Sequence, residues 1–458
     1  MNIHAAQLRP AARAPDAPSR QQRYSASEIQ KLKERDNTTN LRHIGVVYLV
    51  MAATIAAAVW CYNAVLAGQI SFWWAIPVTI LAILAIGSSQ HQLGGVIHEG
   101  THYMLFANRR FSELASDWLA AFPIYTSTYA FRLHHLAHHQ FVNDPERDPN
   151  FGQAKESGHW LDFPVAHVEF AWAVIRLLWP PNLVRYIVAR AKYSAIGVDT
   201  NPYADVNRKG SPWAVRFGVL FAVGAPAVVI PFVALKTWPA AFGALFAMWA
   251  AVSVYYALIP DDHYPKSKID PVISHRATAI GRMTWMAITY GLLTLAEYLY
   301  AVPAWGYFGL LWLLPLFTTF PLFMILREWL QHGNADRGRL TNSRIILERN
   351  PLVRYAVYPW GMDYHLPHHL FASVPHYKLK DLHEVLLRDP EYREKGVIVE
   401  GWTSAPNADS GLPTILDVLG PAYAGRSTEK HVDETTLEMA DVNDKSGVQR
   451  HVEASRAT

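Results

Sequence analysis

Six long apolar segments constrain the fold of this chain more than any other feature of its sequence. They cover residues 44–66, 72–97, 213–235, 239–260, 280–301 and 304–326. A helix needs about 20 mainly apolar residues to cross the hydrocarbon core of a bilayer. Each segment is long enough, although 280–301 is the weakest candidate because it contains Arg282 and Glu297. The sequence therefore predicts an all-α integral membrane protein with four to six transmembrane helices.

The distribution of Lys and Arg predicts how these helices are oriented. The segment before the first apolar run is rich in Arg and Lys, the turn at 67–71 has neither, and the regions 98–212 and 327–425 are again rich in both. Because cytoplasmic loops carry the excess of positive charge, we expect both termini and these two regions on the cytoplasmic side. The same orientation follows whether the chain has four or six transmembrane helices. The polar ends suggest a disordered segment over 1–40, a membrane domain over 41–400 and a polar tail over 401–458.

Composition excludes several classes of function. The net charge is only +3 over 458 residues, so a nucleic-acid partner is not indicated. Cys61 is the single cysteine, which leaves no disulfide framework and no cysteine-rich iron–sulfur site. We find no glycine-rich nucleotide loop, no P-loop and no fused haem motif in the sequence. Any electrons that the protein uses must therefore come from an external donor.

Three histidine clusters and one further histidine lie at the ends of the apolar segments. The clusters are His98-Glu-Gly-Thr-His102, His135-Leu-Ala-His138-His139 and His365-Leu-Pro-His368-His369, and the further residue is His332. Positions i, i+3 and i+4 share one face of a helix, so we expect each cluster to aim its imidazoles at a single point. Imidazole suits Zn, Cu, Fe and Ni. Nine such nitrogens are too many for one ion and about right for two.

Glu328 and His332 follow the sixth apolar run with the i, i+4 spacing of one helix face. We interpret His332 as the ninth ligand and Glu328 as an acidic group that binds metal directly, binds it through water, or orients His332. The alternative is a surface pair of Glu328 with Arg327 or Arg337 and a helix-capping role for His332. His134 points about 100° away from His135 on a helix, so we expect it to be structural or to support a ligand.

Carboxylates near the clusters are candidates to fix the tautomers of the ligating histidines. These candidates are Glu99, Asp144, Asp148, Glu328 and Asp363. The alternative for each is a solvated charge or a salt bridge with Arg132 or Arg147.

Together these residues resemble the membrane-bound fatty acid desaturase family, the histidine-box di-iron proteins, over roughly residues 40–400. The three boxes stand in the family's order, with an apolar hairpin before the first box and further spans before the third. The acidic stretch at 143–149 and the residues 370–383 after the third box are also similar. The chain departs from the family at Asp363, where Asn is common, and at Pro367, where Glu is common. Some relatives have Asn at the position of Glu328.

The resemblance implies a cytoplasmic helical cap that holds two irons and uses O₂. Its ligands would be His98, His102, His135, His138, His139, His332, His365, His368 and His369. The implied reaction is desaturation of a fatty acyl lipid by a desaturase-like domain among membrane lipids. Electrons would come from a ferredoxin or a cytochrome b5 type donor with its reductase. A lipid or terpenoid hydroxylase or ketolase on the same scaffold is the near alternative. A zinc intramembrane protease is the remote one, because His98-Glu99-Gly-Thr-His102 also fits the H-E-x-x-H pattern with Glu99 as base.

Overall fold

The computed structural model describes residues 24–193, 201, 203–204, 210–265, 267–403 and 410–423. Helices account for nearly all of its regular structure. Among the described residues there is one small sheet, in which β1 (Arg344–Leu347) pairs in parallel with β2 (Val397–Glu400). The predicted all-α class is confirmed.

Five helices in the described part of the chain are long and apolar enough to cross a membrane, within the predicted four to six. They cover Thr39–Leu66, Phe72–Thr101, Pro212–Ala234, Trp238–Leu258 and Ala304–His332. In order, these spans contain α2 (Thr39–Leu66), α3 (Ala75–Thr101), α9 (Pro212–Ala234), α10 (Trp238–Leu258), and then α12 (Ala304–Phe308), α13 (Leu314–Phe317) and α14 (Thr319–His332). The predicted segment 280–301 is also helical, as part of α11 (His275–Tyr300). Arg276, Arg282 and Glu297 make α11 less apolar than the other five.

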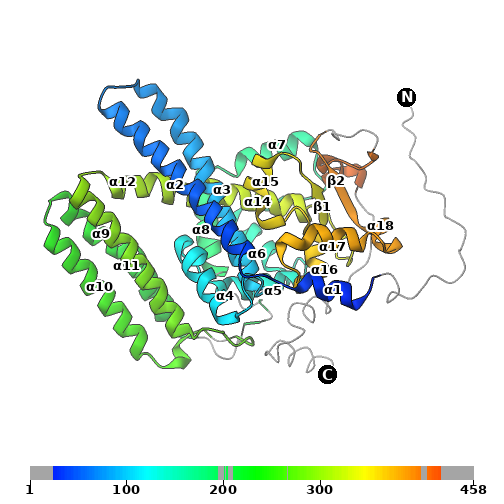
Figure 1. The fold of residues 1–458 in the computed structure, drawn as a ribbon, viewed down its shortest axis with the longest axis horizontal. Coiled ribbons are helices and arrows are strands. Elements are labelled where there is room, and N and C mark those ends of the chain that lie inside the picture. The colour runs from blue at the N-terminus through cyan, green and yellow to red at the C-terminus, as the bar shows by residue number, and fades with distance from the viewer. Residues whose placement is uncertain are drawn as a thin grey trace, which may run out of the picture.

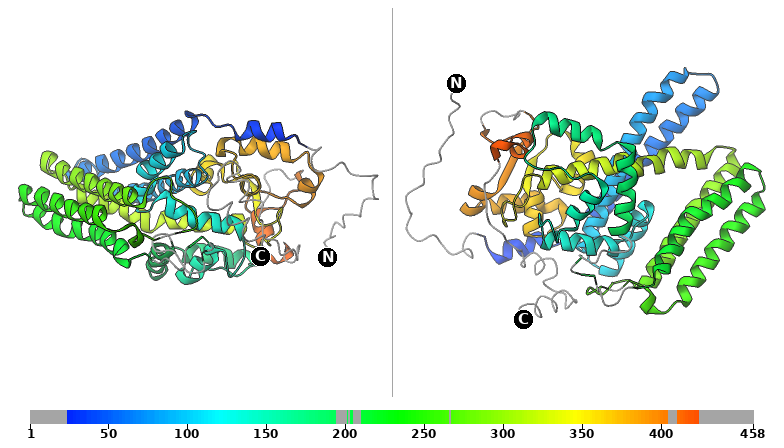
Figure 2. Two further views of the ribbon diagram at one scale, coloured as in Figure 1. Left: turned by 90° about the horizontal axis from the view of Figure 1, so that it is seen from below. Right: turned by 180° about the vertical axis from the view of Figure 1, so that it is seen from behind.

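The long helices form two projections from a central body. Figure 1 shows α2 and α3 as one hairpin and α9, α10 and α11 as a separate bundle, with α12 leading back toward the centre. The bundle has its own apolar core, which includes Phe221, Leu245, Met283 and Tyr290. The shorter helices and the sheet gather at the opposite end of the molecule (Figure 2). This end is the cap, and it receives the C-terminal ends of α3 and α14.

Short helices build the cap, and polar residues begin several of them. The helices are α1 (Ala26–Lys33), α4 (Arg109–Ser116), α5 (Thr128–Gln140), α6 (Pro149–Ser157), α7 (His167–Arg176), α8 (Pro180–Ala191), α15 (Pro351–Val357), α16 (His365–Leu370), α17 (Leu379–Leu386), α18 (Pro390–Lys395) and α19 (Ile415–Leu419). Ser127 begins α5 by accepting from Ala130 N, and Asp148 begins α6 by accepting from Asn150 N. These caps set where the second histidine box starts and where the acidic stretch after it ends.

Packed structure extends beyond both boundaries predicted for the membrane domain. Before residue 41, α1 begins with a capping box at Ser25, and Glu28 forms an ion pair with Arg388 at 2.7 Å. After residue 400, Ile415 and Leu419 of α19 are fully buried. The first segment was predicted to be disordered and the second to be a polar tail because both compositions are polar. A few apolar residues suffice to dock a short helix in each. Residues 1–23 and 424–458 of these two segments lie outside the described residues.

Glycines let α3 approach the cap closely. A Cβ atom at Gly95 would lie 2.3 Å from Cδ1 of Trp360, and one at Gly100 would lie 2.4 Å from Oγ of Ser116. Separations this short do not occur between real side chains, so both positions need glycine. This contact fixes the end of α3, which carries the first histidine box, against the rest of the site.

Candidate metal centre

All nine predicted ligands come together in two buried groups. The first contains His98, His102, His135, His139 and His368, and the second contains His138, His332, His365 and His369. Within each group, one ring nitrogen of every member lies within 4.8 Å of those of the others. No Asp, Glu or Cys belongs to either group among the described residues. Two sets of five and four imidazoles fit two metal ions.

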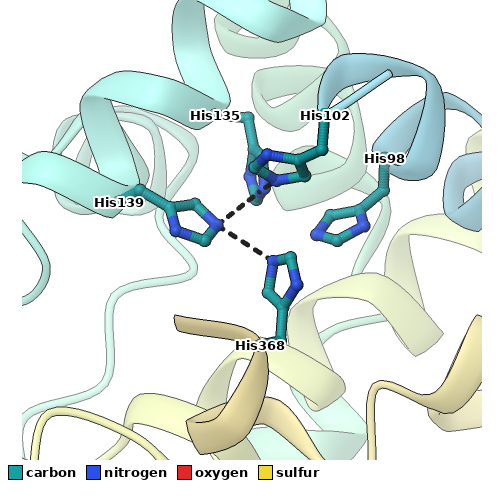
Figure 3. A group of neighbouring side chains, drawn as sticks. All are labelled: His98, His102, His135, His139 and His368. Carbon is teal, nitrogen blue, oxygen red and sulfur yellow. Dashed lines mark hydrogen bonds between the residues drawn. The ribbon is translucent and has the colours of Figure 1, made fainter. Parts of the chain in front are cut away.

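The first group joins three separate helices. His98 and His102 stand at the end of α3, His135 and His139 on α5, and His368 on α16, and Figure 3 shows their rings pointing into one common space. The Nε2 atoms of His135 and His102 lie 2.9 Å apart, as do those of His139 and His135. The Nε2 atoms of His368 and His139 lie 3.1 Å apart.

The second group joins α5, α14 and α16. The Nε2 atoms of His332 and His365 lie 2.8 Å apart, and those of His369 and His365 lie 2.9 Å apart. The ring centroid of His138 lies 4.8 Å from that of His332 and 5.3 Å from that of His369. The structure therefore places His332 among the box histidines.

The expectation that each cluster aims at a single point is wrong for both H-x-x-H-H boxes. In the second box, His135 and His139 belong to the first group and His138 to the second. The third box is reversed, because His365 and His369 belong to the second group and His368 to the first. Consecutive residues on a helix point about 100° apart, whereas i and i+4 differ by about 40°. The two adjacent histidines of each box therefore point into different groups.

The donor atoms of both groups fit bound metal ions. Two imidazole nitrogens that bind one ion at about 2.1 Å and at right angles lie about 3.0 Å apart, which matches the separations above. Burial lowers the pKa of His102 to about 3 and holds the pKa of His135 well below its usual range. In neutral imidazoles the lone pairs of these nitrogens face one another. The single Nε2 of His135 also cannot form a satisfactory hydrogen bond to both His102 and His139. Nε2 of His98 is buried without a hydrogen-bond partner.

Glu99 contacts the protein in a way that disfavours the zinc-protease alternative. Its Oε1 accepts from Nδ1 of His98 at 3.3 Å, and its Oε2 accepts from the backbone N–H of His376 at 3.0 Å. The carboxylate thus orients His98 with Nε2 toward the first group. A general base would instead need to face a metal-bound water.

Outer contacts orient two ligands of the second group. Nδ1 of His138 lies 3.0 Å from Oδ2 of Asp148, and Nδ1 of His332 donates to the carbonyl of Asn342 at 2.9 Å. Such contacts fix the tautomer and turn Nε2 toward the metal. Asp148 and Glu99 are thus in the positions predicted for tautomer-fixing carboxylates.

The other predicted carboxylates have different partners. Asp144 forms ion pairs with Arg147 at 2.7 Å and Arg337 at 3.3 Å. Asp363 pairs with Arg354 at 2.9 Å. Asp144 thus follows the alternative of a salt bridge with Arg147, and Asp363 forms a salt bridge with an arginine that was not predicted.

Glu328 lies outside both groups, and Asn150 stands between it and the second group, with Nδ2 of Asn150 3.1 Å from Nδ1 of His138. Its Oε1 accepts from Nδ2 of Asn150 at 2.8 Å, while Oδ1 of Asn150 accepts from Nε2 of His134 at 2.7 Å. His134 is a member of neither group. Asn150 was not singled out from the sequence, although its place directly after the acidic stretch was a usable signal.

A buried ion pair that the sequence did not predict joins the first and second boxes. Arg132 donates to Oε1 and Oε2 of Glu113 at 3.1 and 2.5 Å. It also donates to the carbonyls of Thr101 at 3.0 Å and Gly100 at 2.9 Å, at the end of α3. Arg132 stands one turn before His135, and this spacing was the only sign of its role.

A large cavity opens beside both groups. Its volume is about 1290 Å³, and its wall includes His98, His135, His138, His332 and Glu328. The ring of Phe131 stacks on His135 with centroids 5.4 Å apart. A substrate in this cavity would lie directly against the candidate metal ligands.

Replacing Asp148 with asparagine is expected to weaken metal binding by about 10- to 100-fold, because the side chain loses the charge that orients His138. The new amide side chain can still cap the start of α6. The measurement is metal affinity by competition with a chelator. Asp144→Asn is the matched control, since Asp144 contacts arginines and no box histidine, and it should change affinity less than about threefold. Equal affinities for wild type and Asp148→Asn would contradict this role.

Comparisons with known proteins agree with this geometry. The family model described as fatty acid desaturase matches residues 71–291 and 273–400. Dihydrorhizobitoxine desaturase of Bradyrhizobium elkanii is 22% identical to the chain over 387 residues, which cover 82% of this chain and 85% of that protein. The ranges matched by the family model include the three histidine boxes and His332. The chain belongs to the fatty acid desaturase family.

Proposed function

We propose that the protein is a di-iron, O₂-dependent desaturase that removes two hydrogens from adjacent carbons of an aliphatic chain. The observation that carries the proposal is the convergence of nine imidazoles in two groups beside one cavity. Imidazole-only ligand sets suit several metals, and family membership favours iron. When bound, the two irons would use O₂ and external electrons to attack an unactivated C–H bond.

The chain's own residues would hold and shield this centre. His98, His102, His135, His139 and His368 would hold one iron, and His138, His332, His365 and His369 the other. All nine are buried, which limits access of water. Phe131 covers one face of His135 on the cavity side.

Glu328 would act as a positioning residue. Its carboxylate accepts from the side chain of Asn150, and the backbone N–H of Asn150 donates to Asp148, the partner of His138. Because Glu328 also lines the cavity, it can carry negative charge beside the reacting chain. The catalytic role predicted for Glu328 stays a proposal, limited here to positioning Asn150 and placing negative charge at the cavity.

The experiment that tests the proposal combines metal analysis with product analysis. Purified protein should contain two irons per chain, and cells that express it should accumulate a product two hydrogens lighter than its precursor. A product with one added oxygen would identify a hydroxylase on the same scaffold. Zinc without iron would reject the di-iron proposal. The predicted acyl lipid substrate, the ferredoxin or cytochrome b5 type donor and the cytoplasmic side of the cap remain proposals.

A further inference from the structure

Four buried or partly buried arginines line the cavity beside the candidate metal centre. They are Arg190, Arg327, Arg339 and Arg344. Within the described part of the chain, none of them forms an ion pair. Nε of Arg327, Arg339 and Arg344 is buried without a hydrogen-bond partner. Burying an unpaired charge is costly, so arginines retained in this state indicate an anionic group that binds there.

Arg190 of α8 contacts the face of α14 that carries Arg327. Nη1 of Arg190 is 3.5 Å from Sδ of Met324, and its guanidinium lies 4.8 Å from the ring centroid of Phe320. Residues 320, 324 and 327 follow the i, i+4, i+7 spacing of a single helix face. Arg190 therefore reaches α14 from α8 about one turn before Arg327. The hydroxyl of Tyr186 lies 3.4 Å from Nη1 of Arg190 and adds a polar group to the same wall.

Three of the five carboxylates that line the cavity accept hydrogen bonds from uncharged groups. Glu328 accepts from Asn150, Asp336 from the backbone N–H of Gly338 at 2.7 Å, and Asp162 from Trp160 at 2.6 Å. Glu328 attracts Arg327 electrostatically, but no ion pair joins a described carboxylate to Arg190 or Arg327, so the charge arrangement at these arginines is open to an anion. An anionic substrate would complete it, and arginine binds carboxylates in a bidentate manner.

We propose that Arg190 and Arg327 bind the carboxylate of the substrate, so that the substrate enters as a free carboxylic acid. This inference rests on the proposed desaturase function and narrows its substrate. A thioester or a lipid ester has no carboxylate at that end of the chain. Phe131, Ile325 and Trp329 also line the cavity and offer apolar surface for the chain itself.

The position of the arginines also limits the length of the substrate. Arg327 precedes His332 by five residues, which is about 7.5 Å along the helix axis. Both side chains line the same cavity, so a carboxylate held at Arg327 would lie near the metal centre, with few carbons between it and the reacting bond. A phospholipid headgroup would need to leave the membrane surface to occupy this place. We therefore assign the site to a compact carboxylic acid.

The proposal is tested by calorimetric titration of the iron-loaded protein with hexanoate, methyl hexanoate and palmitoyl-CoA. Hexanoate should bind at least about tenfold more tightly than its uncharged methyl ester. Arg327→Gln and Arg190→Gln should each weaken hexanoate binding at least about tenfold, and Arg327→Lys should recover part of the loss. Arg185→Gln is the matched control, because Arg185 is an exposed residue of α8 that does not line the cavity, and it should leave binding unchanged.

Two results would overturn the proposal. One is equal binding of acid and ester by the wild-type protein, which needs no variant to fold. The other is tight binding of palmitoyl-CoA with no binding of hexanoate. Either result in a protein that contains two irons and forms a desaturated product would reject the free acid and leave the proposed function standing. Absence of iron would instead reject the proposed function.

Discussion

Replacing His135 with alanine is expected to reduce bound iron from two per chain to one or fewer and turnover by at least about a thousandfold. Nε2 of His135 lies 2.9 Å from Nε2 of both His102 and His139, at the centre of the first group. Losing it leaves an incomplete ligand set. Two-metal chemistry needs both ions, and a thousandfold loss corresponds to only about 4 kcal/mol of transition-state stabilisation.

The matched variants of this experiment separate the two groups. His365→Ala should remove the other iron, because Nε2 of His365 is 2.8 to 2.9 Å from Nε2 of His332 and His369. His134→Ala is the control from the same box, since His134 belongs to neither group, and it should keep two irons per chain. Iron is measured by mass spectrometry of the purified protein. Two retained irons in His135→Ala would show that the first group is not a metal site.

Replacing Arg132 with methionine is expected to lower the free energy of unfolding by about 3 to 5 kcal/mol, because it leaves an uncompensated charge in the interior. Both partners of the Arg132–Glu113 pair are almost completely buried, with side-chain exposures of 1% and 2%. The change also leaves the carbonyls of Gly100 and Thr101 without their donor. The measurement is denaturant-induced unfolding in detergent, on metal-free protein so that loss of metal does not contribute.

Two further variants complete this test. Arg147→Ala breaks the Arg147–Asp144 pair, in which the arginine is 46% exposed, and should cost at most about 1 kcal/mol. The double variant Arg132→Met with Glu113→Leu should recover part of the loss, because it removes the unpaired carboxylate. An Arg132→Met protein as stable as the Arg147→Ala protein would show that the buried pair does not hold the first two boxes together.

Features carried by local patterns could be predicted from the sequence. The long apolar segments gave the spans, and the i, i+3, i+4 spacing gave eight candidate ligands, with His332 added as a ninth candidate from its place after the last span. Features that depend on how distant segments meet could not be predicted. The partner of Arg132 is Glu113, 19 residues away on another helix. The choice of which histidines from different boxes meet in one group also depends on how the helices that carry them come together. The placement of Arg190 near Arg327 depends on the packing of α8 against α14, which the sequence alone does not show.

The exchange of ligands between the second and third boxes also sets an order of events during synthesis. Both groups contain histidines from residues 365–369, which the ribosome completes only after the last span, Ala304–His332. Neither candidate metal site can be complete before residues 365–369 have been synthesised. A chain arrested after the last span but before these residues would therefore lack part of both sites.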